Sequence, residues 1–427
     1  MTTIDDGLNA GASSATLAPV APKNRIATLD VMRGVAVLGI LAVNIPAFAY
    51  PSAVYFNPEL GPFPLIGGAA VAEWVVDVFF HQKFITLFSM LFGASIFLVG
   101  GERRDKPRGK LIRNRLWWLV IIALIHGLLL WWGDVLLLYA CTGLVVMFMR
   151  SWRARTLIIV GSVITFLFFL LQGGSLLALL VAPPEVVAKV AASAGGQSGK
   201  ETAATVAASI AAYNSGWAGM LAENLKPWMF LQQVSLMFLS VPTAGLMLLG
   251  MGLLKSGFWA GRSATWVYAL FIVVGGAVLA LLGWVDWRMI GEEDKFSRLG
   301  LVAGAVGAAP VLITLGYASL LILLTTRGLS ALTAPFAPVG RMAFTNYLTQ
   351  SLLKTTLFTQ PWGPHWIGTL DRPALWIVVV CVWALQLVWS PLWLSRFSHG
   401  PLEWVWRCLT YGRRVPISRD QGVGTGE

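Results

Sequence analysis

Charged residues are scarce in this sequence of 427 residues. Asp, Glu, Lys and Arg together make up only 12% of it, whereas hydrophobic residues make up 57%. No polar stretch is long enough to form a separate soluble domain. Together these shortages exclude an ordinary soluble protein. Runs of roughly 20 apolar residues, the length that crosses a bilayer, recur along the chain. We therefore predict an all-α fold, a polytopic bundle of transmembrane helices whose main partner is the lipid bilayer.

Cysteines and nucleotide-binding motifs are also sparse. The three cysteines, Cys141, Cys381 and Cys408, lie in or beside apolar runs and lack the spacing of a metal or redox site. We therefore expect neither a metal centre nor a disulfide framework. The sequence contains no Gly-x-x-x-x-Gly-Lys-Ser/Thr loop and no dinucleotide fingerprint. ATP-driven transport within this chain is accordingly not expected.

The N-terminal segment lacks the basic start, the apolar run and the cleavage site of a signal peptide. Residues 1–24 are rich in Ala, Ser, Thr and Gly, so we predict a disordered tail that is retained. A single transmembrane domain is then expected at 25–412, with a long external loop at 183–227. Residues 413–427 are expected to form a cytoplasmic tail.

Apolar runs and the charges between them predict about ten spans and their orientation. The expected spans lie near 28–49, 79–100, 113–132, 134–149, 156–182, 228–254, 264–285, 300–325, 338–358 and 374–394. The net charge of +11 could indicate a nucleic-acid partner, but most of the 31 Lys and Arg residues fall in alternate short segments between apolar runs. This is the positive-inside pattern. It places both termini in the cytoplasm and argues against nucleic acid as a partner.

The first predicted span begins with a charged pair. Asp30 and Arg33 are three residues apart, so they lie on one helix face and can neutralise each other. Ionisable residues at the edge of hydrocarbon are costly and often functional. An ion pair that ties the first helix to its neighbours explains the same two residues. Asn44 lies on this helix near its outer end.

A candidate catalytic set lies deeper in the predicted bundle. Among the four histidines, only His126 falls well inside a predicted span. Asn44 lies at a similar depth, and Asp134 begins the next helix. A neutral histidine can act as a general base when a carboxylate orients it and an amide binds an oxyanion. The alternative is packing, in which His126 donates to a helix carbonyl and Asn44 bonds a neighbouring helix.

Arginines gather at the predicted cytoplasmic helix ends. Arg33, Arg113, Arg115 and Arg341 lie there, and Asp30 is placed to orient Arg33. Guanidinium groups bind phosphates well, so this cluster suits a phosphorylated cofactor such as a coenzyme A thioester. Lipid headgroups and membrane topology account for the same arginines.

A polar stripe marks the ninth predicted span. Asn346 and Gln350 are one helical turn apart, so they lie on the same face of that helix. Such a stripe lines either a cavity or a contact between helices, and both interpretations stay open.

Separated motifs resemble those of YeiB-like proteins, a family of bacterial polytopic membrane proteins largely without assigned function. The matching stretches are Leu29-Asp30…Arg33-Gly34…Asn44, Lys83-Phe84…Phe92-Gly93, His126-Gly127…Gly133-Asp134, Gly340-Arg341…Gln350-Ser351 and Gly400-Pro401-Leu402-Glu403-Trp404…Trp406-Arg407. One departure is Gln82, where the family commonly has glycine. The resemblance covers almost the whole chain and implies location in the bacterial inner membrane.

The opening helix also resembles those of two groups of membrane acyltransferases. OafA-like O-acyltransferases have a histidine implicated in catalysis eleven residues after the arginine, and that position is Asn44 here. Heparan glucosaminide N-acetyltransferases have asparagine at this place and their catalytic histidine elsewhere. The second resemblance implies that Asn44 positions a substrate or intermediate. His126 is our candidate base because of its depth in the bundle.

These observations predict a membrane acyltransferase. It would move an acyl group from a cytoplasmic coenzyme A thioester to an acceptor at the outer side. His126, Asn44 and Asp134 would form the catalytic set, and Arg33, Arg113, Arg115, Arg341 and Asp30 the donor site. The alternatives are a transporter or flippase of a small or lipid-linked solute, and a structural or assembly protein. The acyl group, the acceptor and association into a homo-oligomer are left open.

Overall fold

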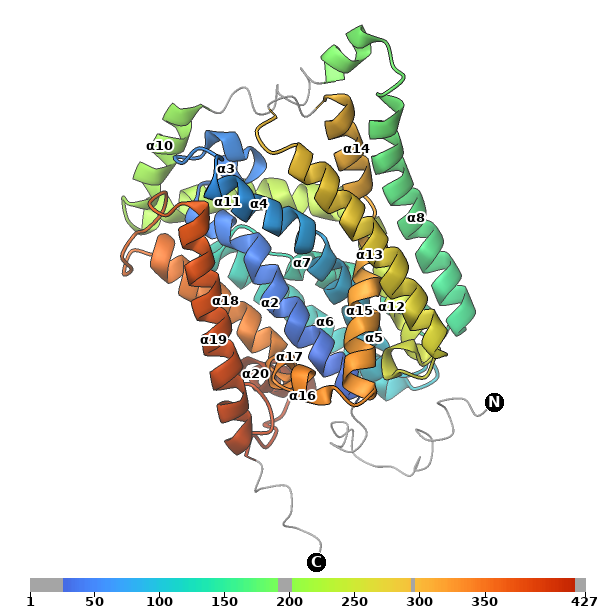
Figure 1. Cartoon of the computed structure of the whole chain (residues 1–427). Coiled ribbons are helices and arrows are strands. Elements are labelled where there is room, and N and C mark those ends of the chain that lie inside the picture. Colours follow the sequence, from blue (N-terminus) through green and yellow to red (C-terminus); the bar gives the residue numbers. More distant parts are fainter. Residues whose placement is uncertain (1–25, 191–201, 293–295, 419–427) are drawn as a thin grey trace, which may run out of the picture.

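A computed structural model describes residues 26–190, 202–292 and 296–418. These residues form helices and connecting turns, and the only extended pairing among them is an isolated β-bridge between Phe397 and Ser418 (Figure 1). The predicted all-α bundle is therefore confirmed. The tail predicted at 1–24 lies outside the described residues.

The helices follow one another closely along the chain. The first third contains α2 (Ala27–Ala49), α3 (Ser52–Phe56), η2 (Pro58–Leu60), α4 (Gly68–Phe79), α5 (Lys83–Gly100), α6 (Lys106–Ile125), η3 (His126–Leu130), α7 (Leu136–Val146) and η4 (Met147–Met149). The middle contains α8 (Ala154–Ala178), α10 (Ala203–Tyr213), α11 (Trp217–Val234), η5 (Ser235–Leu239), α12 (Ser240–Lys255), η6 (Phe258–Ala260) and α13 (Thr265–Arg288). The last third contains α14 (Arg298–Gly307), α15 (Pro310–Thr326), α16 (Ser330–Thr333), α17 (Phe336–Arg341), α18 (Ala343–Phe358), α19 (Arg372–Arg396) and α20 (Pro401–Tyr411).

Several helical segments are long and apolar enough to cross a membrane, which makes the chain a multi-pass membrane protein. In the described part of the chain these seven are Ala27–Ala49, Gly68–Gly100, Lys106–Leu130, Ala154–Ala178, Trp217–Lys255, Thr265–Arg288 and Arg372–Arg396. The pair α14 and α15, bent by 49°, adds an eighth if it counts as one span.

Two of the ten predicted spans are helices shorter than a bilayer crossing needs. The span predicted at 134–149 is the short helical segment Leu136–Met149, and that at 338–358 contains α18, which has 16 residues. Both begin only after a break, at Asp134 and at Met342. The loop predicted at 183–227 contains α10 and the first part of α11.

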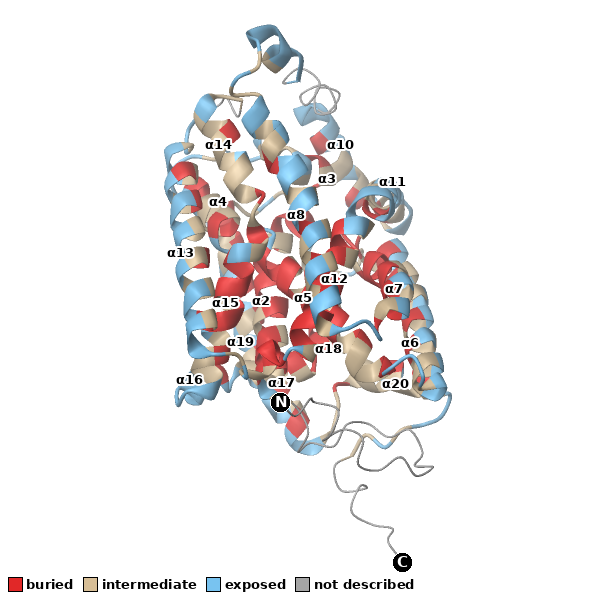
Figure 2. Cartoon of the chain, turned by 90° about the vertical axis from the view of Figure 1, so that its right-hand side faces the viewer, coloured by how far each residue is buried: buried red, intermediate tan, exposed pale blue. Residues whose placement is uncertain are grey.

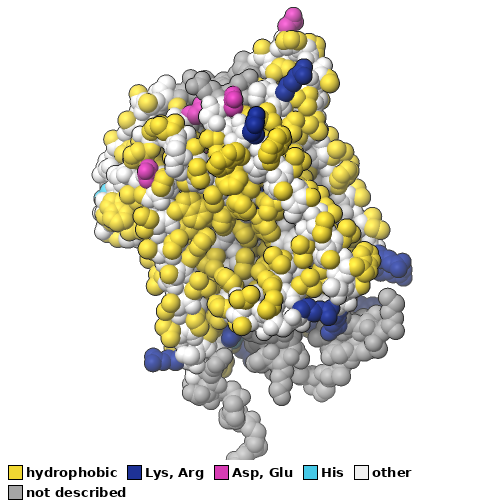
Figure 3. Space-filling model, viewed as in Figure 1, with side chains coloured by type: hydrophobic (Ala, Val, Ile, Leu, Met, Phe, Trp, Pro, Cys, Tyr) yellow, Lys and Arg dark blue, Asp and Glu magenta, His cyan; other side chains and the backbone are white. Residues whose placement is uncertain are grey.

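The bundle has an inner group of helices and an outer group that faces lipid. In α2, 78% of the most apolar stretch is buried, against 17% in α8 and in α13. Figure 2 shows buried residues along α2, α5 and α12 and exposed ones along α13. Large apolar side chains on the outer helices, such as Phe166 and Val273, are exposed. Figure 3 shows hydrophobic side chains over a broad middle part of the surface. Such a covering is what a membrane-embedded surface requires.

One end of the bundle is basic, and we call it the basic end. It is the end where α2 begins and α19 finishes (Figure 1). On the face in Figure 3 that end carries Lys and Arg, and the Asp and Glu side chains lie in the opposite half. Within this end α2 and α17 touch backbone to backbone. A Cβ on Gly340 would overlap the carbonyl oxygen of Asp30, so only glycine permits the contact. The contact places Arg33 and Arg341 on adjacent helix segments.

Candidate functional site

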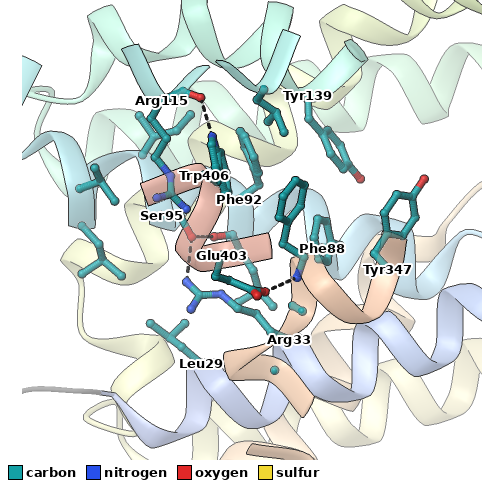
Figure 4. Close-up of a pocket in the computed structure, with 18 of the residues that line it drawn as sticks. Leu29, Arg33, Phe88, Phe92, Ser95, Arg115, Tyr139, Tyr347, Glu403 and Trp406 are labelled. Atoms are coloured by element: carbon teal, nitrogen blue, oxygen red, sulfur yellow. Dashed lines mark hydrogen bonds between the residues drawn. The ribbon is translucent and has the colours of Figure 1, made fainter. Parts of the chain in front are cut away.

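A cavity of about 300 Å³ lies among α2, α5, α6, α7, α17, α18 and α20, and it begins near the basic end. Four arginines and two carboxylates line it: Arg33, Arg115, Arg341, Arg407, Asp30 and Glu403. Figure 4 shows Arg33, Arg115 and Glu403 toward one side and Tyr139 and Tyr347 on the other, with Phe88 between them. The cavity therefore has a charged end and a tyrosine end.

Arg33 is held by two neighbours at the charged end. Its Nη2 donates to Ser95 Oγ of α5 at 2.8 Å, and its Nη1 lies 3.4 Å from Asp30 Oδ1. The spacing of Asp30 and Arg33 along the sequence predicts this pairing. Both side chains keep some exposure, 25% for Arg33 and 15% for Asp30. The guanidinium is therefore oriented by its partners and still faces the cavity.

Arg115 is held by an aromatic side chain from another helix. Its guanidinium carbon lies 3.6 Å from the ring centroid of Trp406 in α20, and Trp406 Nε1 donates to the Arg115 carbonyl oxygen at 3.0 Å. Arg113 is exposed and does not line the cavity. Helix positions two apart point in different directions, so α6 brings only one of the two predicted arginines into the site.

Glu403 joins α20 to the start of α18. Its carboxylate accepts hydrogen bonds from the backbone nitrogens of Phe344, at 2.8 Å, and Thr345, at 3.0 Å, and from the Thr345 hydroxyl. The first N–H groups of a helix have no partner within it, so an acceptor here stabilises the helix start. Burial raises the pKa of the Glu403 carboxyl above its ordinary value.

Beyond the tyrosine end lies a buried chain of hydrogen bonds. His126 Nδ1 is 2.8 Å from Asp134 Oδ1, and His126 Nε2 is 2.9 Å from Ser351 Oγ. Each of the three residues is only 1% exposed. The second oxygen of Asp134 accepts from the backbone nitrogen of Leu137, at 3.0 Å, and so caps α7. A serine, a histidine and a carboxylate in this order are the set that activates a hydroxyl for acyl transfer.

The local backbone explains how the histidine reaches its partners. His126 begins η3, a π-helical turn. Such turns are rare in proteins as a whole, but those that occur are often found at functional sites. Asn224 of α11 donates to the carbonyl oxygen of Gly127 at 2.9 Å, and Gln232 donates to that of Asp134 at 3.0 Å. A Cβ on Gly127 would overlap Trp228, so α11 packs directly on the turn.

The cavity and the buried cluster meet at Tyr347. This residue lines the cavity, and its ring centroid is 5.6 Å from that of His126. Val135, which follows Asp134, lines the cavity too. His126 also lies near Trp131, with ring centroids 6.4 Å apart, and Trp131 lines a second, small cavity of about 10 Å³. His126 thus neighbours one lining residue of each cavity without lining either.

The structure brings together most of the predicted site residues. His126 contacts Asp134, and Asp30, Arg33, Arg115 and Arg341 line one cavity. Asn44 is half-buried on α2. In the described part of the chain its side chain makes no hydrogen bond to His126 or Asp134 and lines neither cavity. The role predicted for Asn44 at the reacting centre therefore stays a prediction.

Two residues of the site were missed. Ser351 follows Gln350, the end of the polar stripe, and Glu403 lies in the last of the matching motifs. Both residues lie in stretches that the sequence motifs single out, but the motifs do not show their partners. Ser351 contacts His126, 225 residues away in the chain, and Glu403 contacts Thr345, 58 residues away. Gln350 itself lies in a helix contact, where it donates to Gln386 at 2.9 Å. Among the described residues, no group of three or more His, Cys, Asp or Glu is placed to hold a metal.

Fold and site define a multi-pass helical membrane protein with a charged cavity beside a buried Ser–His–Asp cluster. The chain belongs to the YeiB-like family, as the sequence motifs predict, and the family model described as "Protein of unknown function (DUF418)" matches residues 248–413. The chain is 33% identical over 409 residues to the uncharacterized protein YeiB of Escherichia coli (strain K12), covering 90% of this chain and 96% of YeiB. It is 29% identical over 433 residues to the uncharacterized protein YxaH of Bacillus subtilis (strain 168), covering 96% and 100%.

Proposed function

We propose that this protein is an acyltransferase of the bacterial inner membrane. In this proposal both termini are cytoplasmic, so the basic end faces the cytoplasm. An acyl group enters from a cytoplasmic coenzyme A thioester and leaves to an acceptor at the outer side. The observation that carries the proposal is a single cavity with arginines at one end and the His126–Asp134 pair just beyond the other.

The charged end suits the phosphates of the donor. Arg33 and Arg115 lie in the cavity wall with their guanidinium groups oriented by Asp30, Ser95 and Trp406. Arg341 lines the same cavity. Fixed guanidinium forks bind phosphate through charge-assisted hydrogen bonds. We assign Arg33, Arg115 and Arg341 to donor binding, and we leave out Arg113 because its side chain points away from the cavity.

The volume of the cavity suits the flexible arm of the donor. A volume of about 300 Å³ is at the lower end of ligand pockets, which hold roughly 300–1,000 Å³. It accommodates the arm and a short acyl group rather than the whole of coenzyme A. The nucleotide phosphates would stay at the basic end, and the arm would pass Phe88 and Phe92 toward Tyr347.

The buried pair supplies the proton transfer. An ionised carboxylate only accepts hydrogen bonds, so Asp134 fixes the proton of neutral His126 on Nδ1. Nε2 is then an acceptor and can take a proton from a hydroxyl. Deprotonating the attacking hydroxyl in this way contributes about 10²–10⁴-fold to such a reaction.

A transporter is the second candidate, and Lys354 favours it. This lysine is 1% exposed, and its Nζ lies 3.9 Å from the ring centroid of Phe48. Ionisable residues inside a membrane bundle commonly mark an ion or substrate path. Here the two cavities, each with a lining residue near His126, would be parts of that path.

A binding and turnover assay separates the two candidates. Purified protein in lipid nanodiscs is incubated with radiolabelled acetyl- or palmitoyl-coenzyme A, and bound donor and released thiol are measured. We expect Arg33→Ala to lose donor binding, and His126→Ala to bind donor and lose turnover. Folded wild-type protein that neither binds nor cleaves either donor would contradict the proposal. For the transporter, solutes extracted from the membrane are offered to proteoliposomes without any acyl donor. Uptake of these solutes without chemical change, and its loss in Lys354→Met, would favour the transporter.

A further inference from the structure

We infer that Ser351 is a nucleophile that carries the acyl group as an ester between donor and acceptor. This inference rests on the proposed function and adds a covalent step to it. It assigns to the site a residue that touches the reacting carbon, whereas His126 alone would act as a base toward the acceptor.

The hydrogen bonds of Ser351 point its proton toward His126. A serine inside a helix commonly donates to the carbonyl oxygen four residues earlier. For Ser351 that oxygen belongs to Tyr347 and is 3.4 Å away, whereas His126 Nε2 is 2.9 Å away. Because Asp134 fixes the histidine proton on Nδ1, Nε2 must accept and the serine must donate. This is the arrangement of an activated nucleophile.

The position of Ser351 in the bundle matches a relay. It lies one turn after Tyr347 on the same face of α18, and Tyr347 lines the larger cavity. Trp131, whose ring centroid is 6.4 Å from that of His126, lines the small cavity. An ester on Ser351 would lie next to His126, whose ring neighbours one lining residue of each cavity. The donor could leave toward the basic end before an acceptor arrives from the other end.

The two half-reactions balance. In the first, Ser351 Oγ bonds to the thioester carbonyl carbon and gives its proton to His126 Nε2. The carbon–sulfur bond then breaks, and the departing sulfur takes that proton as free coenzyme A. In the second, an acceptor hydroxyl gives its proton to Nε2 and its oxygen bonds to the acyl carbon. The ester bond to Ser351 breaks, and Oγ recovers the proton.

A packing role for Ser351 makes different expectations. A serine that only joins α18 to η3 would contribute stability and would show no raised reactivity. An activated serine reacts with fluorophosphonates, which release fluoride and form a stable adduct. It also forms an oxygen ester with the donor acyl group, which survives neutral hydroxylamine but not alkali.

The test combines both reagents on the full chain in nanodiscs. Wild type, Ser351→Ala, Ser351→Cys, His126→Ala and Ser319→Ala are treated with an alkyl fluorophosphonate or with radiolabelled acetyl- or palmitoyl-coenzyme A, and adducts are located by peptide mass spectrometry. Ser319 is a matched control, because it is a fully buried helix serine outside the site. We expect adducts at Ser351 in wild type and Ser319→Ala, none in Ser351→Ala, and at least about a hundredfold slower labelling in His126→Ala. In Ser351→Cys the acyl group should become labile to neutral hydroxylamine.

The outcomes separate this inference from the proposed function. Donor turnover that persists in Ser351→Ala, or wild-type protein without an adduct at Ser351 from either reagent, overturns the nucleophile. If the fluorophosphonate labels Ser351 in wild type but no donor is bound or cleaved, the nucleophile stands and the donor assignment fails. The cysteine variant shows whether lost labelling in Ser351→Ala reflects chemistry, because a misfolded site would not yield a thioester at residue 351.

Discussion

The two ends of the main cavity differ in how their polar groups are held. At the charged end Arg33 and Glu403 have two partner residues each, Arg115 contacts Trp406 twice, and four arginines line the same cavity. Beyond the tyrosine end a single chain of hydrogen bonds runs from Asp134 through His126 to Ser351, with almost no exposure. The charged end is held by several separate contacts, whereas the three side chains of the buried cluster are joined by one hydrogen bond between each neighbouring pair.

This difference follows from the cost of charge in a membrane bundle. Near the basic end water and headgroups screen the arginines, so several cations can share one cavity. Deep in the bundle an unpaired charge is expensive. The buried cluster contains one carboxylate, which the backbone of Leu137 and the ring of His126 both satisfy. We therefore expect substitutions at the charged end to reduce affinity step by step, and substitutions in the buried cluster to abolish chemistry.

The largest effect is expected for His126→Ala. Loss of the base should lower turnover of acyl-coenzyme A by about 10²–10⁴-fold, while donor affinity stays near that of wild type. Asn44→Ala is the comparison, because among the described residues Asn44 makes no hydrogen bond to His126 and should lose less. Turnover and equilibrium donor binding are measured on the same samples. If Asn44→Ala lost as much turnover as His126→Ala, the predicted role of Asn44 at the reacting centre would be supported instead.

A smaller effect is expected for Arg115→Ala, with Arg113→Ala as its matched control. Hydrogen bonds to charged groups contribute about 1.5–3 kcal/mol, so loss of the cavity arginine should weaken donor binding by about ten- to a hundredfold. Arg113 points away from the cavity and its loss should change affinity less than about twofold. Isothermal titration with coenzyme A measures both. Equal losses in the two variants would mean that the arginines act through overall charge alone.

The same contrast shows what the sequence predicts and what it does not. Composition and the apolar runs are enough to predict a bundle of membrane helices. Each run of spanning length predicts a helix in lipid by itself, without knowledge of its neighbours. The spacing of Asp30 and Arg33 suffices for their pairing, since it depends on a single helix. The pairing of His126 with Asp134 spans only eight residues and a tight hairpin. The similar depth of the two residues makes their meeting possible, and the structure pairs them.

Contacts between helices that are far apart in the chain could not be predicted from the sequence. Which of Arg113 and Arg115 faces inward depends on the packing of α20 against α6 through Trp406. Ser351 meets His126 only because α18 starts at a break after α17 and is held there by Glu403. The length of the span predicted at 338–358 was overestimated for the same reason. Apolar composition at 338–358 indicates a crossing, but the chain breaks at Met342 and leaves a short buried helix.

The contact between α2 and α17 gives a prediction of intermediate size at the charged end. Gly340→Ala would place a methyl group against the backbone of Asp30 and Gly34, which cannot give way as a side chain can. Overpacking of this kind costs about 1–3 kcal/mol, and it should also weaken donor binding by moving Arg341. Gly276→Ala in α13 is the control, because nothing lies within 4 Å of its new methyl group. Thermal unfolding in detergent compares the two, and equal melting temperatures would contradict the close contact.

The smallest effect concerns the pH dependence of the charged end, through Glu403. Burial raises the pKa of this carboxyl in the folded protein, so folding favours its protonated form. The resulting stability is fully present below about pH 4, where the unfolded group is also protonated. It is lost as pH rises through the folded-state pKa. Glu403→Gln keeps an acceptor oxygen for Phe344 and Thr345 and removes the titration.

We therefore expect wild type and Glu403→Gln to differ in how their melting temperatures respond to pH. From about pH 4 upward the wild type should lose stability relative to the variant, by no more than a few degrees, because the hydrogen bonds from the start of α18 compensate part of the cost of the charge. Melting curves at matched ionic strength between pH 4 and 8 measure the difference. A wild type that gains stability over Glu403→Gln as pH rises would mean that these helix N–H groups outweigh burial. The charged end would then be stabilised by an ionised Glu403. At neutral pH the negative charge of that carboxylate would repel the donor phosphates and weaken their binding.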